Sequence, residues 1–364
     1  MQESNAMQKT DARQKTIRVL SIDGGGIRGL VPAVILDKLE RLTGKATAEL
    51  FDLMAGTSTG GILALGLSRP GPDGRPLYPA EKMAELYEKE GRRIFISSFW
   101  RKIRSVGSLT EERYPAAGIE TVLRQYFGES RLRDACTDVL VPSYEIERRV
   151  PFFFRSAMAR ERSDYDFPMW LAARATSAAP TYFEPTKVPA GNDHWALIDG
   201  GVFANNPAAC ALVEARVRHP EATDFLLVSL GTGIRMKRFA IEDAQRWGAA
   251  RWLRPVLDIV LDGGSATVDY QMEQILGADY LRFQTNLQPG EEAMDDVRPR
   301  TLRSLRLLAE GLCRERVRDL AGLADRLVAI GRGRQERPEG RGCEANSQEP
   351  ASPPPRQQER KKSG

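Results

Sequence analysis

A serine between glycines is the first residue in this chain with the right surroundings for nucleophilic chemistry. Ser58 stands in "GTSTG", which matches the pattern G-x-S-x-G and separates an apolar segment from a segment of small residues. In a nucleophile elbow, the residues two before and two after the serine cannot carry a Cβ without clashing; Gly56 and Gly60 meet that need. A serine hydroxyl is a poor nucleophile until a base accepts its proton, so another residue must supply the base.

The choice of base is narrow because the chain has only two histidines. We expect His219 at the end of a helix and His194 in a polar loop that precedes a strand, so a Ser-His-Asp triad is disfavoured. Asp199 is the alternative base, because it ends a predicted strand in "IDGG" beside Gly200 and Gly201. Taken alone, Asp-Gly is also a common turn signal, so this motif acquires meaning only together with the others.

A third glycine turn, "DGGGIRG", could stabilise negative charge. The amides of Gly24, Gly25 and Gly26 can point into one space as donors to an oxyanion, while Arg28 would fix the loop or add positive potential. The same glycines match G-x-G-x-x-G, so a nucleotide-binding enzyme is the alternative reading. That reading needs an acidic residue about 20 positions further on, and Asp52 lies inside a strand and too far away.

The segments around these turns alternate between strands and helices, which predicts a mostly parallel sheet covered on both faces. The three glycine turns would then meet at the carboxyl ends of the strands. We predict strands at 17–22, 49–56, 137–145, 150–155, 195–201 and 224–233. We predict helices at 30–42, 58–68, 80–93, 116–127, 168–180, after Pro207, and at 249–262, 265–277 and 299–330.

The ordered set "DGGGIRG", "GTSTGG" and "DGG" resembles the motifs of patatin-like phospholipases and lipid acyl hydrolases, bacterial members included. "ARATSAAPTYFEP" and "DGGVFANNP" add to the likeness, which spans residues 17–285. The resemblance implies a three-layer α/β/α fold and cleavage of phospholipid acyl esters by a dyad of Ser58 and Asp199, without a metal or other cofactor. It also implies an oxyanion hole formed by Gly24, Gly25, Gly26 and Arg28.

Composition divides the chain into a globular body and two polar ends. We expect a flexible N-terminus at 1–16, a catalytic domain at 17–285 and a helical extension of that domain at 286–331. Residues 332–364 are rich in proline and charge, with eight Lys or Arg against five Asp or Glu, so we expect a disordered basic tail. The formal charge of +4 therefore leaves about +1 for the body, which disfavours a nucleic-acid partner.

The four cysteines are far apart in the sequence and predict neither a disulfide framework nor a metal site. The N-terminus lacks the apolar region of a secretory signal, and no segment is apolar enough to span a membrane. We therefore expect a cytoplasmic protein that is at most peripheral to a membrane. "FISSFWRK" at 95–102 combines aromatic and basic residues suited to a lipid surface, although packing of its aromatics on the core is favoured.

Regulation is a further alternative. Some bacterial members of the family that this chain resembles are phospholipases activated by cyclic dinucleotides in anti-phage defence, so the resemblance offers as an alternative an effector activated by a small nucleotide or a protein partner. No residue pattern in the chain indicates such a ligand site. The sequence indicates neither the oligomeric state, the acyl position cleaved nor the preferred head group.

Overall fold

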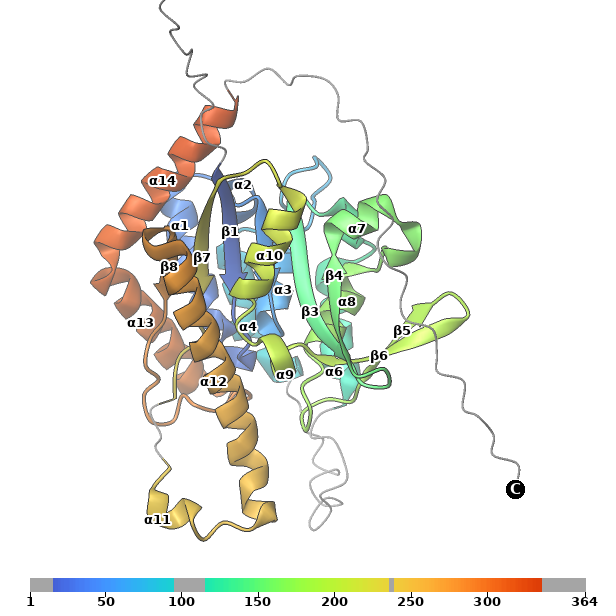
Figure 1. Ribbon diagram of the computed structural model, residues 1–364, viewed down its shortest axis with the longest axis vertical. Helices are drawn as coiled ribbons and strands as arrows, with labels where there is room; N and C mark the ends of the chain where they lie inside the picture. The colour runs from blue at the N-terminus through green and yellow to red at the C-terminus, as the bar shows by residue number, and fades with distance from the viewer. Residues whose placement is uncertain (1–15, 95–114, 236–238, 336–364) are drawn as a thin grey trace, which may run out of the picture.

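The structure is a computed structural model that describes residues 16–94, 115–235 and 239–335. A central sheet runs through it in the order β5-β6-β3-β2-β1-β7-β8, and β4 also pairs with β3 (Figure 1). Strands β3, β2, β1, β7 and β8 are parallel neighbours, whereas β4, β5 and β6 join by antiparallel pairing. The strands are β1 (Thr16–Ile22), β2 (Leu53–Gly56), β3 (Asp138–Glu145), β4 (Val150–Arg155), β5 (Thr186–Ala190), β6 (Asp193–Asp199), β7 (Asp224–Leu230) and β8 (Tyr280–Phe283).

Helices cover both faces of the sheet, which confirms the three-layer prediction (Figure 1). Ile17 and Val19 of β1 join the core under α10 and α12, while Leu20 and Ile22 join the larger core under α1 and α3. The longer helices are α1 (Leu30–Thr43), α3 (Thr59–Ser68), α4 (Ala80–Ile94), α6 (Ala116–Phe127), α8 (Met169–Thr176), α10 (Ala208–Arg218), α12 (Ala249–Leu276), α13 (Pro299–Glu315) and α14 (Val317–Gln335). The shorter ones are α2 (Thr47–Leu50), α7 (Ser156–Glu161), α9 (Gly201–Ala204) and α11 (Ile241–Ala244).

Strand β3 brings two other strands end to end. Its first part pairs with β2, where Leu140 lies opposite Ala55, and its last part pairs with β6, where Ser143 lies opposite Asp199. Since β4 pairs along 140–145 and so occupies the other edge of β3, β2 and β6 share one edge. They run in opposite directions, so their carboxyl ends meet. The prediction of meeting strand ends therefore holds, but by antiparallel pairing of β6 and not by a parallel neighbour.

Three predicted elements differ from the structure. The predicted strand 49–56 begins with α2 and only then becomes β2. Two helices are predicted on either side of Gly263 and Gly264, but the structure has one helix, α12, that continues through both glycines. Each glycine costs a helix only about 1 kcal/mol, so tertiary contacts of the flanking turns can outweigh it.

The C-terminal run predicted as one helix at 299–330 is two helices, α13 and α14, that meet at Arg316. Both bury leucines against α1 in the larger core, and α14 continues to Gln335, past the predicted boundary at 331. The predicted flexible residues 1–15, the segment 95–102 and the tail from 336 lie outside the described residues.

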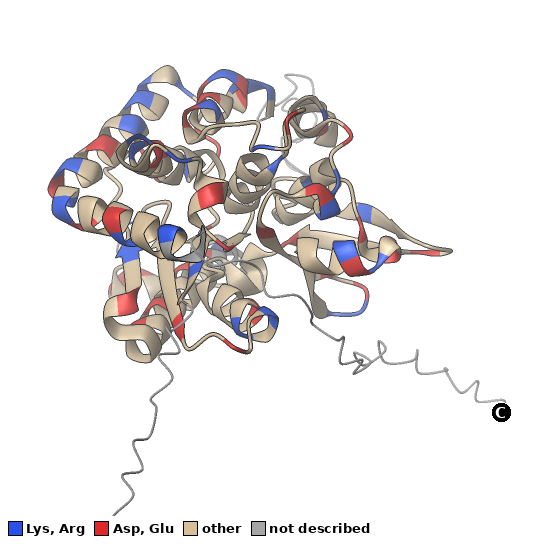
Figure 2. Ribbon diagram, turned by 90° about the horizontal axis from the view of Figure 1, so that it is seen from above, with Lys and Arg blue, Asp and Glu red and all other residues tan. Residues whose placement is uncertain are grey.

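Charges are mixed over the described surface. Figure 2 shows basic and acidic residues interspersed along the helices, and many of them pair with each other. Among the described residues no group of three or more His, Cys, Asp or Glu side chains is placed to hold a metal ion. No helix in the described part of the chain is both long and apolar enough to cross a membrane.

Candidate active site

The turn between β2 and α3 holds Ser58 in a strained backbone conformation. Ser58 has a φ of 55°, in the region that L residues rarely adopt. A Cβ on Gly56 would lie 2.0 Å from the carbonyl oxygen of Gly60, and a Cβ on Gly60 would lie 2.2 Å from that of Ile22. Both clashes are with backbone, so the turn cannot accept a side chain at either position. The half-buried Ser58 side chain is thereby lifted off the end of β2.

Asp199 ends β6 beside Ser58. Its carboxyl group is buried; it accepts a hydrogen bond of 2.7 Å from the Gly201 N–H, and the Ser58 side chain is near enough to lower its pKa. Burial raises the pKa of Asp199 to about 6, and the Ser58 side chain and the Gly201 N–H partly oppose that rise. Gly200 is required as well, because a Cβ there would lie 2.4 Å from the Pro142 carbonyl oxygen. The structure therefore brings the two predicted dyad residues together.

The C-terminal end of α8 fixes the backbone around both residues. The Thr176 hydroxyl accepts a hydrogen bond of 2.9 Å from the Ser58 N–H and donates one of 2.6 Å to the Pro142 carbonyl. The Asp199 N–H donates to the Ala178 carbonyl at 3.0 Å. Sequence reasoning did not assign Thr176, although it lies in "ARATSAAPTYFEP"; a threonine at a helix end has no pattern that reveals a partner 118 residues away.

Distant segments of the chain fill the space beside each glycine of the loop after β1. A Cβ on Gly24 would lie 2.5 Å from the Asn205 side chain, and one on Gly25 would lie 2.3 Å from the Thr232 hydroxyl. Gly26 has a φ of 60°, and a Cβ there would lie 2.2 Å from the Met294 carbonyl. The glycines therefore admit other parts of the protein on those sides. A Cβ on Gly24 would also lie 3.4 Å from the Cβ of Ser58, so this side of the loop faces Ser58.

The loop amides are not equivalent. The Gly24 N–H donates to the Asn205 carbonyl at 3.0 Å, so it is not available as an oxyanion donor in this arrangement. The N–H groups of Gly25 and Gly26 have no partner among the described residues. The buried Arg28 side chain donates to the carbonyl oxygens of Gly25, at 3.2 Å, and Gly233, at 3.4 Å, and so holds the loop in place. Burial lowers the pKa of Arg28 to about 10, and Arg28 is still a cation at neutral pH.

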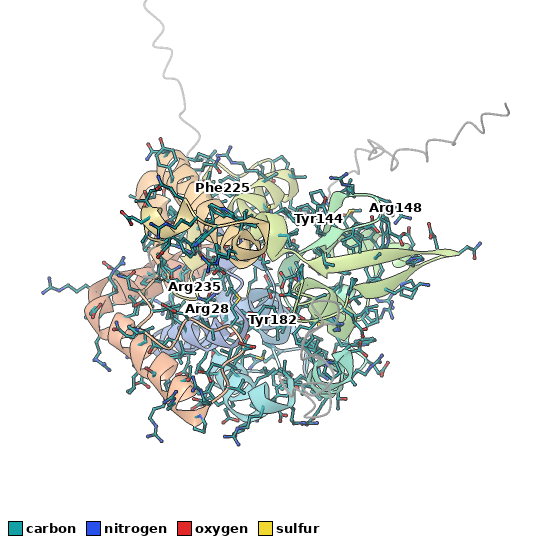
Figure 3. The ribbon with its side chains drawn as sticks, turned by 90° about the horizontal axis from the view of Figure 1, so that it is seen from below. Arg28, Tyr144, Arg148, Tyr182, Phe225 and Arg235 are labelled. Atoms are coloured by element: carbon teal, nitrogen blue, oxygen red, sulfur yellow. The ribbon has the colours of Figure 1, made fainter. Side chains whose placement is uncertain are left out.

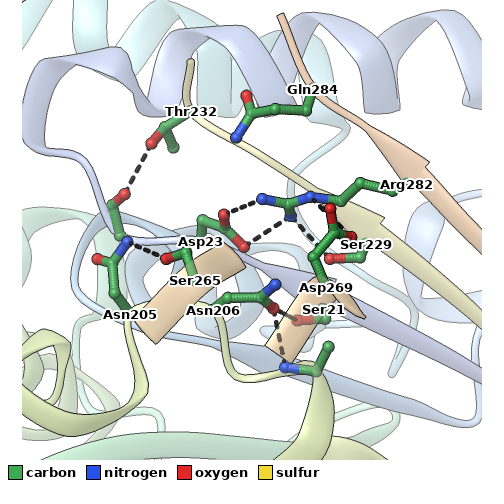
Figure 4. Close-up of polar contacts among 12 residues, drawn as sticks. Ser21, Asp23, Asn205, Asn206, Ser229, Thr232, Ser265, Asp269, Arg282 and Gln284 are labelled. Carbon is green, nitrogen blue, oxygen red and sulfur yellow. Dashed lines mark hydrogen bonds and ion pairs between the residues drawn. The ribbon is translucent and has the colours of Figure 1, made fainter. Parts of the chain in front are cut away.

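A buried ion pair supports the same loop from behind (Figure 4). Asp23 directly follows β1 and accepts a hydrogen bond of 2.9 Å from Arg282 of β8, which also donates to the Ser229 hydroxyl at 2.8 Å. Burial raises the pKa of Asp23, and Arg282 opposes the rise. Thr232 donates to the Gly24 carbonyl at 2.7 Å. Sequence reasoning missed these contacts because 259 residues separate Asp23 from Arg282.

The structure also locates the residues of the alternative interpretations. Asp52 is the candidate acidic residue that would bind the ribose of a nucleotide. It forms an ion pair of 2.8 Å with Arg18 near the N-terminal end of β1, whereas the glycine loop follows the C-terminal end. His194 lies near the start of β6, so about five residues of strand separate it from Asp199. His219 caps the C-terminal end of α10, as predicted. None of these residues belongs to the group formed by Ser58, Asp199 and the glycine loop.

This fold and this site define a class of protein: an α/β domain with a serine elbow opposite a buried aspartate and a glycine loop. The chain belongs to the patatin-like phospholipase family, because the family model described as "Patatin-like phospholipase" matches residues 20–212. The comparisons support a lipid acyl hydrolase as the type of enzyme.

Curated relatives agree with this assignment. Patatin-like protein 1 of Oryza sativa subsp. indica is 33% identical over 350 residues, which cover 86% of this chain and 81% of the relative. Patatin-like protein 2 of Arabidopsis thaliana is 32% identical, with 81% of each chain covered. Patatin-15 of Solanum tuberosum is 30% identical over 337 residues, which cover 84% of this chain and 85% of that relative.

Among solved structures, VipD from Legionella pneumophila has a TM-score of 0.35 and 14% sequence identity, covering 84% of this chain and 69% of that chain. The type III effector protein ExoU has a TM-score of 0.36 and 11% identity, with coverages of 86% and 53%. The family assignment rests on the sequence comparisons.

Proposed function

We propose that this protein hydrolyses fatty acyl esters of membrane phospholipids with Ser58 as nucleophile and Asp199 as general base. The observation that carries the proposal is the strained elbow at Ser58, whose side chain lies beside a buried carboxyl group and lowers its pKa. A carboxylate with a pKa of about 6 is a stronger base than an ordinary aspartate and is still ionised at neutral pH. The chemistry needs no metal or other cofactor.

In the first step, Asp199 accepts the proton of Ser58 while the Ser58 oxygen attacks the ester carbonyl carbon. The N–H groups of Gly25 and Gly26 donate to the oxyanion, and each such donor contributes about 3 kcal/mol. The tetrahedral intermediate collapses as the bond to the leaving oxygen breaks, and Asp199 returns the proton to that oxygen. The products are an acyl-serine and a lysophospholipid.

In the second step, Asp199 accepts a proton from water, and the hydroxide oxygen attacks the acyl-serine carbonyl. The same amides stabilise the second oxyanion. The bond to the Ser58 oxygen breaks, Ser58 regains the proton from Asp199, and a fatty acid leaves. Asp199 serves both steps, so its loss would stop acylation and deacylation alike.

The test measures fatty acid release from mixed-chain phosphatidylcholine by mass spectrometry. We expect Ser58→Ala and Asp199→Asn each to lose at least about 1,000-fold in kcat, because the two residues act as one unit. His194→Ala is the matched control and should keep wild-type activity, as should the wild type in EDTA. Full activity in a correctly folded Ser58→Ala protein would refute the mechanism, and the product masses identify the acyl position cleaved.

A further inference from the structure

The N-terminal half of helix α12 has an apolar face that points away from the rest of the protein. This half and α11 project beyond the edge of the sheet at which β1 ends (Figure 1). Side chains there that are 38–63% exposed, here called the apolar end, are Phe239, Ile241, Trp252, Val256, Ile259 and Val260. The α12 members, from Trp252 to Val260, follow each other at intervals of four, three and one residues, so they form one stripe of the helix.

The opposite face of α12 is polar and points toward the candidate active site. Asp258 pairs with Arg235, and Ser265 accepts a hydrogen bond of 3.1 Å from Asn205. Asp269 lies 3.7 Å from Arg282, the partner of Asp23.

These positions on α12 also follow helical spacing, and Asp262 between them interacts with the charge of Arg28. Figure 3 shows Arg28 and Arg235 at this end of the molecule, together with Tyr182. In the N-terminal half of α12 these polar contacts face the body and the aliphatic residues face outward, whereas Val268, Met272 and Leu276 of the second half pack on the smaller core.

In the N-terminal half of α12 this orientation reverses the usual arrangement of a helix on a globular body, in which the apolar face is buried. Apolar side chains exposed together in this way mark an interaction surface. Aromatic rings strengthen the same end, because Trp247 contacts Phe239 at 5.3 Å and Trp252 at 5.1 Å between ring centroids. Arg246 and Arg251 beside them are exposed and form no ion pair among the described residues. Aromatic and aliphatic residues edged by arginine are typical of segments in a lipid interface.

We propose that the apolar end inserts into the surface of a phospholipid bilayer and presents the Ser58 edge of the sheet to the lipid. This inference rests on the proposed function, because it supplies the route by which a membrane lipid reaches Ser58. A second copy of the chain is a weaker occupant, since a protein seated on this projecting end would cover the edge that the substrate must approach. When the apolar end inserts into the bilayer, the polar face of α12 keeps its contacts with the body of the protein.

The test compares vesicle binding of variants in the Ser58→Ala background, so that turnover does not alter the membrane. The apolar-end variant is Val256→Ser/Ile259→Ser/Val260→Ser. The matched control is Val213→Ser/Val217→Ser, which changes aliphatic side chains of α10 that are 61% and 68% exposed. Binding is measured by co-flotation with phosphatidylcholine vesicles. Because each buried aliphatic side chain contributes substantially to transfer into lipid, we expect the apolar-end variant to bind roughly 100-fold more weakly and the control to bind as the parent does.

A second measurement separates this proposal from the proposed function. With Ser58 restored, the apolar-end variant should hydrolyse a soluble short-chain ester at the wild-type rate and vesicle phospholipid far more slowly. Equal vesicle binding by the parent and the apolar-end variant would overturn the docking proposal, even if the soluble ester is cleaved. If sedimentation shows that the parent is a dimer, that the same substitutions dissociate it and that neither protein binds vesicles, the surface belongs to a second copy of the chain. If the wild type cleaves neither substrate, the proposed function fails whatever the vesicle result.

Discussion

The elbow at Ser58 and the loop after β1 are both glycine turns, but they need glycine for different reasons. In the elbow, a Cβ on Gly56 would meet the Gly60 carbonyl, four residues away in the same turn, and only the Cβ of Gly60 would meet another segment, at the Ile22 carbonyl of β1. In the loop, the Cβ atoms of Gly25 and Gly26 would meet Thr232 and Met294, which lie more than 200 residues further along the chain. A local requirement appears in the sequence as a fixed spacing, whereas a long-range requirement appears only as unexplained glycines. The elbow motif therefore indicates its role more directly than the loop motif does.

The largest expected effect tests the local requirement. Gly56→Ala would place a Cβ 2.0 Å from a backbone oxygen, so the turn between β2 and α3 must distort. We expect a loss of more than about 4 kcal/mol in the free energy of unfolding, measured by urea denaturation. Gly264→Ala is the matched control, because its Cβ would meet no atom within 4 Å inside α12. That control should be neutral or stabilising by up to about 1 kcal/mol. A stable Gly56→Ala protein would contradict the steric argument.

A smaller effect tests the long-range requirement. The Cβ of Gly25→Ala would meet the Thr232 side chain at 2.3 Å and no backbone atom at comparable distance. We expect Gly25→Ala to cost about 1–3 kcal/mol and to lower kcat, because the amides of the loop shift. Adding Thr232→Gly removes the clashing atoms and should restore part of the kcat. No restoration would mean that the loop needs Gly25 for its backbone and not for the space beside it.

At Asp199 we expect a substitution to raise the free energy of unfolding, whereas the glycine substitutions lower it. Burial raises the pKa of Asp199 from 3.8 to about 6, so the folded protein holds the proton more tightly than the unfolded chain does. The stability that this proton linkage contributes is fully present below the unfolded value and is lost as pH rises through about 6. We therefore expect Asp199→Asn to have a free energy of unfolding about 1–3 kcal/mol higher than the wild type at neutral pH, measured by urea denaturation. The difference should shrink in acid, and a less stable variant at neutral pH would contradict the pKa shift.

The mildest change leaves the sequence intact and alters only pH. If ionised Asp199 is the base, kcat/KM for a soluble ester should fall about tenfold per pH unit below the pKa of about 6. The elbow itself does not titrate, so this limb belongs to the aspartate. The control is the urea midpoint across the same range, which shows that the protein remains folded. A flat profile through this range would exclude Asp199 as the base.

Local patterns allowed most elements to be predicted. The apolar periodicity of α1 and the β-branched and aromatic residues of β3 and β4 gave bounds close to those observed. Prediction failed where tertiary contacts override local signals. Gly263 and Gly264 were expected to end a helix, yet α12 runs through them because Ser265 and Asp269 hold it to the body. The short strand β8 was missed as well, although it supplies Arg282 to the ion pair with Asp23.

The sequence by itself determined the chemistry available to this protein: a serine in an elbow, a scarcity of histidine and an aspartate ending a strand. Those features depend on residue type and on spacings of a few residues. Only the tertiary structure decided how Ser58 and Asp199 meet, because β2 and β6 approach from opposite directions along one edge of β3. It also decided that Gly24 is engaged by Asn205 and that the N-terminal half of α12 turns its apolar face outward. Pairing between distant segments sets these features, and no short stretch of sequence encodes it.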